Sequence, residues 1–252
     1  MDEIESIERA TLAAVPPEAM ELLAGWLLPF DSGRVWRAHS AVPLQHVVPS
    51  PEVLNAIARR YRERGHAPVF RVPDLAAFEA LQGDLARNGF GAGKPTLMQS
   101  IVLGEGKALA MNVRARQVAS GAATVQIAGT PSPGWADVFL GEGLAPVDGA
   151  GRLAMLQRSA DNVFAAVNVE GAVLAVGAGC FACGRCVIHG MRTLPAWRGR
   201  GFARAIVASL LAQAGSRGIS SGLLQVEEGN DAARSLYGAL GFATKWRYRY
   251  WK

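Results

Sequence analysis

The sequence lacks both a long apolar run and a basic leader. In its 252 residues no stretch approaches the roughly 18 consecutive apolar residues that a membrane-spanning helix needs. The longest apolar stretches, at about residues 22–30 and 172–181, are short enough to be elements of a folded core. The first five residues include Asp2, Glu3 and Glu5, whereas a secretory leader begins with basic residues. We therefore expect a cytoplasmic protein without membrane contact.

A dense block of lysine and arginine is also missing, although the formal net charge is +5 and the pI about 9.4. Such a mild excess favours anionic ligands, including the phosphates of a nucleotide cofactor. The tail at residues 246–252 alternates aromatic and basic residues. This pattern can stack on RNA, but it is also the period of a half-buried strand. We favour the strand and expect no nucleic-acid partner.

Cysteine is scarce, and the three that occur lie together as Cys180, Cys183 and Cys186. Their spacing could suggest a metal or iron–sulfur site, but a fourth ligand is missing. Gly184 and the residue after it are typical of a hairpin turn, which would point the thiols in different directions. We expect buried, reduced cysteines and no metal site.

The composition, half hydrophobic and 19% charged, is that of a soluble globular protein, and the length allows two domains. Apolar spacing and turn residues predict alternating helices and strands, with a linker near residues 104–112. Helices are expected at 3–14, 17–28, 51–65, from Asp74 to about 88, after Pro133, at 202–214 and at 230–240. Strands are expected at 34–42, 69–72, 96–103, 163–169, 172–182, 185–193, 222–227 and 243–251.

The two halves share a short pattern, in which a leucine-rich helix ends in Gly-Phe. Residues 81–85 before Gly89-Phe90 resemble residues 236–240 before Gly241-Phe242. Each pattern follows a predicted strand and precedes another. Either the two halves are related units, or one leucine-rich helix in each half ends in the same way by coincidence.

The most informative segment is residues 191–203, where a predicted strand leads through a glycine-rich turn into a helix. The first N–H groups of a helix have no partners within it, and the helix dipole adds positive charge there, so this end can hold a pyrophosphate. The turn is not a P-loop, since the Lys-Ser/Thr pair is absent. It is not a Rossmann fingerprint either, because the preceding strands are predicted to be antiparallel.

The continuation of the chain makes the interpretation more specific. Arg198-x-x-Gly201-x-Ala203 resembles the Arg/Gln-x-x-Gly-x-Gly/Ala motif of the GNAT acyltransferase superfamily. A second match runs from Val226 through Asn230 and Tyr237 to the closing Gly-Phe pair. The resemblance covers about residues 160–245 and is faint before them.

The resemblance implies a set of site residues. The end of the strand would pair with the pantetheine arm of acetyl-CoA, the glycine-rich turn would hold its pyrophosphate, and Asn230 would contact the cofactor arm. The cofactor-binding residues implied in this way are Met191, Arg192, Thr193, Arg198, Gly199, Arg200, Gly201, Phe202, Ala203 and Asn230. Tyr237 would protonate the leaving thiolate, because a phenol and a thiol have similar pKa values.

The acceptor amine must lose a proton before it attacks, so the site needs a base or a chain of water molecules. His189 is a candidate, because it lies two residues before Met191 and alternation would place both on one face of the strand. Glu227 and Glu228, which follow the next strand, are alternatives.

These features predict an α/β protein with a mixed, mostly antiparallel sheet flanked by helices: the GNAT fold, in tandem. We expect a degenerate GNAT-like domain at residues 1–108 and a catalytic domain at 109–252. Only ten residues follow Phe242, which leaves room for one strand where GNAT domains commonly have two. We therefore expect the family's sheet to be completed by the N-terminal half or by another chain, as in a homodimer. The loop at residues 46–50 replaces the glycine-rich turn in the N-terminal half, and Gln82 replaces the tyrosine.

The predicted function is transfer of acetyl from acetyl-CoA to an amine of a small molecule, peptide or protein. A tandem-type transferase of another acyl or aminoacyl group is the first alternative. A non-catalytic acyl-CoA sensor is the second. The sequence does not choose among the acceptors.

Overall fold

The computed structural model describes residues 2–104, 111, 123–141 and 146–252, so the predicted domain boundary at 108/109 lies outside the described residues. The helices are α1 (Glu3–Ala13), α2 (Val53–Glu63), α3 (Glu79–Arg87), α5 (Pro133–Leu140), α6 (Pro146–Gln157), α7 (Phe202–Ser216) and α8 (Asp231–Leu240). The strands are β1 (Ala19–Leu23), β2 (Trp26–Phe30), β3 (Val42–Pro43), β4 (Phe70–Pro73), β5 (Thr96–Val102), β6 (Ala123–Ala128), β7 (Asn162–Val169), β8 (Ala172–Ala182), β9 (Arg185–Thr193), β10 (Ser221–Glu227) and β11 (Ala243–Trp251).

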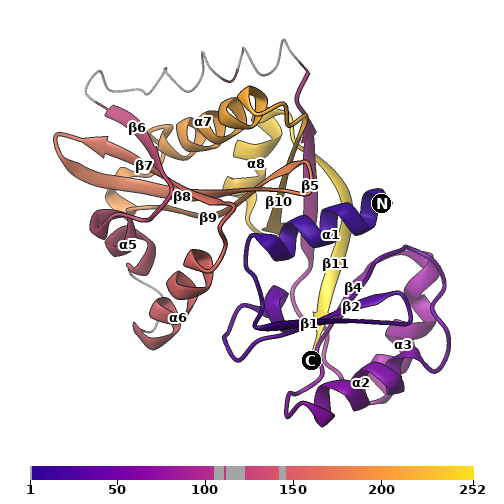
Figure 1. Ribbon diagram of the computed structural model, residues 1–252. Helices are drawn as coiled ribbons and strands as arrows, with labels where there is room; N and C mark the ends of the chain where they lie inside the picture. Colours follow the sequence, from indigo (N-terminus) through magenta and orange to yellow (C-terminus); the bar gives the residue numbers. More distant parts are fainter. Residues whose placement is uncertain (1, 105–110, 112–122, 142–145) are drawn as a thin grey trace.

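The two halves of the chain repeat one order of elements. The N-terminal half runs β1-β2-β3-α2-β4-α3-β5, and the C-terminal half runs β7-β8-β9-α7-β10-α8-β11. In each, three antiparallel strands are followed by a helix and a strand parallel to the third, as the pairs β9·β10 and Ala41↔Phe70 show. Figure 1 shows the two units at opposite corners of the molecule. The repeated order supports related units rather than a coincidence of two helices.

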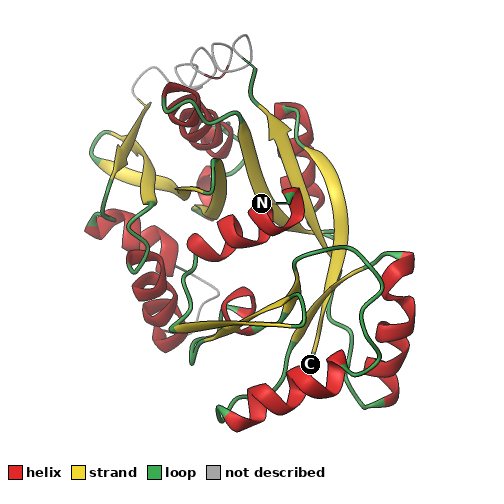
Figure 2. Cartoon of the chain, turned by 45° about the vertical axis from the view of Figure 1, so that its right-hand side comes forward, coloured by secondary structure: helices red, strands yellow, loops and turns green. Residues whose placement is uncertain are grey.

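The last strands of the two halves are exchanged. The large sheet has the order β4-β11-β5-β10-β9-β8-β7-β6, so β5 lies between β10 and β11 and is antiparallel to both. In return, β11 pairs with β4 of the N-terminal half. Figure 2 shows these strands running from one unit into the other. The N-terminal half therefore completes the sheet of the C-terminal half, one of the two expected solutions.

Helices cover both faces of the large sheet. On one face α7 and α8 enclose a core that includes Ile206, Leu211 and Leu224. Gly179 lets α7 lie close, since a Cβ there would come within 2.9 Å of Leu210. On the other face, α5 and α6 pack against β8 and α1 lies over the middle strands. Among the described residues, no helix has both the length and the apolar character needed to cross a bilayer.

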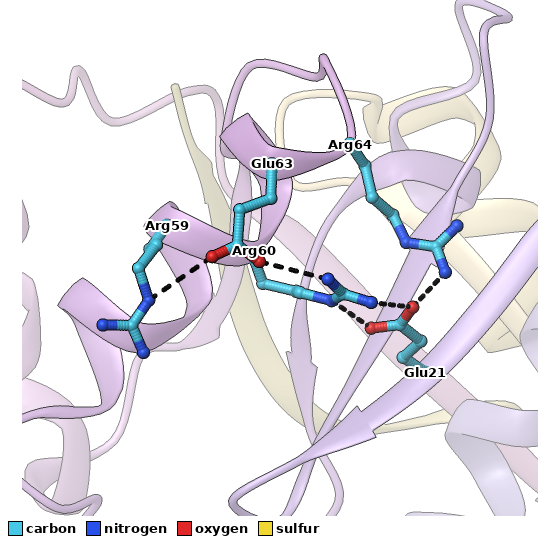
Figure 3. A network of polar contacts seen from close by, with 5 residues as sticks. All are labelled: Glu21, Arg59, Arg60, Glu63 and Arg64. Atoms are coloured by element: carbon cyan, nitrogen blue, oxygen red, sulfur yellow. Dashed lines mark hydrogen bonds and ion pairs between the residues drawn. The ribbon is translucent and has the colours of Figure 1, made fainter.

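A smaller core holds α2 and α3 against β1, β2 and β4. At its surface an ion-pair network joins α2 to the edge strand β1 (Figure 3). Arg60 Nε and Nη2 donate to the two carboxylate oxygens of Glu21 at 2.6 and 2.8 Å, and Arg64 also contacts Glu21. Glu63 pairs with Arg60 and Arg59 on the solvent side.

Three expectations about the N-terminal half were wrong. The predicted helix at 17–28 is the hairpin β1-β2, because Ala24 and Gly25 adopt positive φ angles of 49° and 77° and reverse the chain. The predicted strand at 34–42 contains a 3-10 helix, Trp36–His39, and only Ala41 and Val42 at its end pair with other strands. Asp74 caps no helix, because its carboxylate binds the side chains of Arg247 and Arg249 from β11.

Candidate functional site

The parallel strands β9 and β10 separate from each other partway along their length. Only three residue pairs join them, and the last is Ile188↔Leu224. β9 continues to Thr193 and β10 to Glu227, and within the described residues no strand lies between these two arms. The edge of β9 that faces β10 is therefore available to pair with an extended ligand from about residue 189 onward.

A β-bulge lies where the strands separate. The pairing of β8 with β9 shifts register opposite Gly190, whose φ is +62°. A Cβ on Gly190 would meet Phe139 and Leu156, on the face that carries α5 and α6. Met191 instead packs beside α7 on the other face. The expectation that His189 and Met191 share one face was wrong, because the bulge adds a residue between them.

The glycine-rich turn leaves the first amides of α7 free. Gly199 and Gly201 have φ angles of 76° and 82°, and a Cβ on either would meet no atom within 4 Å. Gly201 precedes α7, no side chain caps the helix, and the first helical bond is Ala205 N to Gly201 O, at 3.0 Å. No described residue accepts from the amides of residues 202–204. This end can therefore bind an anion.

Aromatic and basic side chains surround this turn. Trp197 stacks on Phe202 with ring centroids 6.2 Å apart, and the Arg200 guanidinium lies 4.5 Å from the centre of the Trp197 ring. Arg198 donates weakly to the carbonyl of Thr193, at 3.4 Å. The guanidinium groups add positive charge at the end of α7, where its dipole is already positive.

Helix α8 begins beside the end of β10. Asn230 precedes its first residue, and the Asn230 side-chain oxygen accepts from the amide of Ala233 at 3.1 Å. The side-chain nitrogen of Asn230 is then left to make the cofactor contact that the sequence predicts. Tyr237 lies on the side of α8 that faces the sheet, 7% exposed, with its ring 5.9 Å from that of Phe242.

The phenol of Tyr237 is protonated at neutral pH. Burial raises its pKa from the usual value near 10. No described residue accepts or donates a hydrogen bond at its hydroxyl, so this O–H group is available to another partner. Both features suit a general acid, and that role stays a prediction.

His189 is a buried, neutral ring. Asn162 donates through Nδ2 to the carbonyls of Ala14 and Leu156, which leaves its Oδ1 as the acceptor for His189 Nε2 at 3.2 Å. The proton of the ring is therefore on Nε2. Burial, and then the charge of Arg37, lower the pKa of His189 to about 3. Such a weak base does not favour the predicted base role, which stays a prediction.

This burial predicts a pH-dependent stability. The neutral form of His189 is favoured by folding, so its contribution is complete above about pH 6.5 and is lost as the pH falls toward about 3. In that window the free energy of unfolding should fall by about 1.4 kcal/mol more per pH unit in the wild type than in His189→Gln. Urea titrations at pH 4, 5 and 6 measure the difference. Equal slopes in the two proteins would contradict it.

The two candidate glutamates line an open recess at the end of β10. It is bounded by residues 227–232 together with Lys94 and Pro95 of the N-terminal half. Glu227 Oε2 lies 3.8 Å from Lys94 Nζ, and Glu228 Oε1 lies 3.6 Å from Arg247 Nη1. Asp231 also lines the recess, and its Oδ1 lies 3.1 Å from Arg234 Nη1, so each of the three carboxylates has a basic partner. The base role of either glutamate stays a prediction.

The three thiols lie apart in the hairpin of β8 and β9. Cys180 packs beneath α1, Cys186 packs beneath α7 on the opposite face, and Cys183 is exposed at the turn. Burial raises the pKa of Cys180 and of Cys186 to about 12. In the described part of the chain, no group of three or more His, Cys, Asp or Glu side chains could hold a metal ion.

Some residues of this site were not singled out from the sequence. Gly190 could have been, because a glycine inside a strand often marks a bulge. Lys94 and Asn162 gave no signal, since both reach the site through the tertiary fold.

Comparison with known proteins agrees with this architecture. A structure of a GCN5-related N-acetyltransferase from Kribbella flavida matches with a TM-score of 0.71 at 18% identity, covering 100% of this chain and 95% of that one. A functionally unknown conserved protein from Staphylococcus epidermidis matches with a TM-score of 0.66 at 11% identity, covering 94% of each. A tandem GNAT protein from the clavulanic acid pathway matches with a TM-score of 0.61 at 13% identity, covering 99% of this chain and 94% of that one.

At these identities the structural likenesses show the fold alone. No curated protein matches the sequence. The profile of the family described as "Probable histone acetyltransferase Rv0428c C-terminal" matches residues 1–251. The chain therefore belongs to that family, and through it to the GNAT superfamily of acyltransferases.

Proposed function

We propose that this protein transfers an acetyl group from acetyl-CoA directly to an amine, without a covalent enzyme intermediate. The proposal rests on two binding groups that follow each other directly in the chain. The open edge of β9, at residues 190–193, leads through a short turn to the free amides at the start of α7. A linear cofactor with amides in its arm and a pyrophosphate next to them fits this sequence of binding groups.

In this proposal the pantetheine arm, the pyrophosphate and the thiolate of acetyl-CoA each have a partner. The backbone of residues 191–193 pairs with the pantetheine arm as a further strand would, and the amides of residues 199–203 hold the pyrophosphate. The amide nitrogen of Asn230 contacts the arm from the other side. Tyr237 gives its proton to the thiolate as the carbon–sulfur bond breaks.

An amine acceptor is supported by the carboxylates that line the recess at the end of β10. Amines are cationic in water, and Glu227, Glu228 and Asp231 each already pair with a cationic side chain there, so an amine can take the place of one. The name of the matched family refers to histone acetylation, which is consistent with a lysine side chain as the acceptor.

We assign cofactor binding to the C-terminal domain, residues 109–252, and not to residues 1–108. In the N-terminal half the corresponding helix is α2, and the segment before it includes Pro49 and Pro51, which have no N–H to donate. The carboxylate of Glu52 is also located at this helix end and would repel phosphate. The N-terminal half instead contributes β5 and one wall of the recess.

Calorimetric titration with acetyl-CoA tests the proposal. Gly201→Glu places a carboxylate beside the free amides of α7 and should weaken binding by at least about 100-fold, equivalent to about 2.7 kcal/mol. Gly218→Glu is the matched control. Gly218 has a similar φ of 73°, an equally open Cβ position, and a location at the far end of α7. It should bind acetyl-CoA as the wild type does, within about threefold.

Two outcomes count against the proposal. One is a wild-type protein that binds no acetyl-CoA at millimolar concentration. The other is an equal loss of affinity in the two variants, which would reflect the strain of a side chain at positive φ rather than a phosphate site.

A further inference from the structure

Among the described residues that line the recess at the end of β10, Lys94 is the one with a basic side chain. It comes from the N-terminal half, in the loop before β5, whereas the acids Glu227, Glu228 and Asp231 belong to the C-terminal half. Lys94 Nζ lies 3.8 Å from Glu227 Oε2. A primary amine of the chain itself therefore occupies the recess to which we assign the acceptor.

The backbone around Lys94 is fixed, while its side chain is free to move. The amide of Gly93 donates to the carbonyl of Tyr250 at 2.7 Å, and the carbonyl of Pro95 accepts from the amide of Glu228 at 2.9 Å. These bonds hold the loop against both β11 and the end of β10. The Lys94 side chain is 85% exposed, so nothing around it prevents a change of rotamer.

The recess adjoins the separated strands where the thioester would lie. Glu227 is only three residues beyond Leu224, the last residue of β10 that pairs with β9. On its other side, Asn230 leads into α8, along which Tyr237 lies about 10 Å further at 1.5 Å per residue. The flexible stem of a lysine can cover part of such a distance.

We propose that Lys94 is a modification site, acetylated by the C-terminal domain of its own chain. This inference rests on the proposed function. Lys94 Nζ gives a proton to the Glu227 carboxylate or to water, and the neutral amine attacks the thioester carbonyl. The new carbon–nitrogen bond forms as the carbon–sulfur bond breaks, and the thiolate takes the proton of Tyr237. The nitrogen then loses its second proton, which passes through water and restores the phenol. The products are an amide on Lys94 and free CoA, and no further reactant is needed.

Peptide mass spectrometry of the full chain after incubation with acetyl-CoA tests this proposal. Lys94 should be labelled, and Lys245 should not, since it lies outside the recess in an ion pair with Glu3 at 2.7 Å. The fraction of chains labelled per minute should not depend on protein concentration. Lys94→Arg should remove this label, whereas Lys245→Arg should leave it unchanged. Tyr237→Phe should slow labelling by about 100-fold or more.

Several results would overturn it. Equal labelling of Lys94 and Lys245, or undiminished labelling in Gly201→Glu, would indicate simple chemical acetylation. A fraction labelled per minute that rises in proportion to protein concentration would indicate transfer between molecules. The proposed function is tested separately: if the protein binds acetyl-CoA and acetylates an added amine while Lys94 stays unmodified, only this inference fails. An absence of acetyl-CoA binding overturns both.

Discussion

Tyr237→Phe is expected to lower kcat by about 10²- to 10⁴-fold while the affinity for acetyl-CoA changes little. The expulsion of a thiolate is aided by a proton donor, and the phenol of Tyr237 is buried, protonated and without a hydrogen-bond partner among the described residues. Phenylalanine keeps the ring that packs against Phe242, so the fold should be retained. Steady-state kinetics with an amine acceptor, beside calorimetry with acetyl-CoA, measure the two quantities.

The matched control is Tyr61→Phe. This variant also removes one buried phenolic hydroxyl, which donates to the carbonyl of Pro29 at 2.9 Å in the N-terminal half. It should cost about 1 kcal/mol of stability and leave kcat unchanged. If Tyr237→Phe retains full turnover, Tyr237 is not the acid. If no amine, small or peptide, is acetylated by the wild type although acetyl-CoA binds, a sensing role replaces the enzyme.

Five strands of the C-terminal half, β7 to β11, could be predicted from the sequence almost to the residue. The turns at Gly171 and Gly184, both with positive φ, separate three apolar runs, which are β7, β8 and β9 as expected. The glycine-rich turn likewise marks the start of α7. In these segments the local signal and the tertiary fold agree.

The hairpin β1-β2 could not be distinguished from a helix in the same way. β2 is buried on both faces, so its five residues show no alternation, and a short apolar run fits either structure. Only the Ala24-Gly25 pair signalled a turn. Asp74 was misassigned for a different reason, because Arg247 and Arg249, its partners, are more than 170 residues away in the chain.

The geometry of the candidate site was only partly predictable. The sequence indicated its residues, since the glycine-rich turn and Tyr237 occur in a recognisable order. It did not indicate the bulge at Gly190, which turns His189 away from the face of Met191. Nor did it show which segment lies beside β10, because strand exchange pairs β5 with a strand about 120 residues later.

Glu8→Ala is expected to destabilise the protein by about 3–5 kcal/mol. Glu8 of α1 pairs with Arg71 of β4, with 2.6 Å between Oε2 and Nη2 and side chains only 3% and 1% exposed. Burial raises the pKa of Glu8 and the charge of Arg71 opposes that shift. No described residue accepts a hydrogen bond from Arg71 Nε, Nη1 or Nη2, so the contact of Nη2 with Glu8 is an ion pair. Without Glu8 the guanidinium would be buried with no counter-charge.

A double variant distinguishes the cost of an unpaired charge from the strength of the pair itself. In Glu8→Met with Arg71→Met both charges are gone, and two apolar side chains of similar length fill the space. The free energy of unfolding should then return to within about 2 kcal/mol of the wild type. An exposed pair is the comparison: Glu63→Ala breaks contacts with Arg59 and Arg60 at the surface (Figure 3) and should cost less than about 1 kcal/mol. Urea unfolding measures all three. A double variant as unstable as Glu8→Ala would mean that α1 is held by the pair itself. Recovery would mean that Arg71 requires a partner only because it is buried.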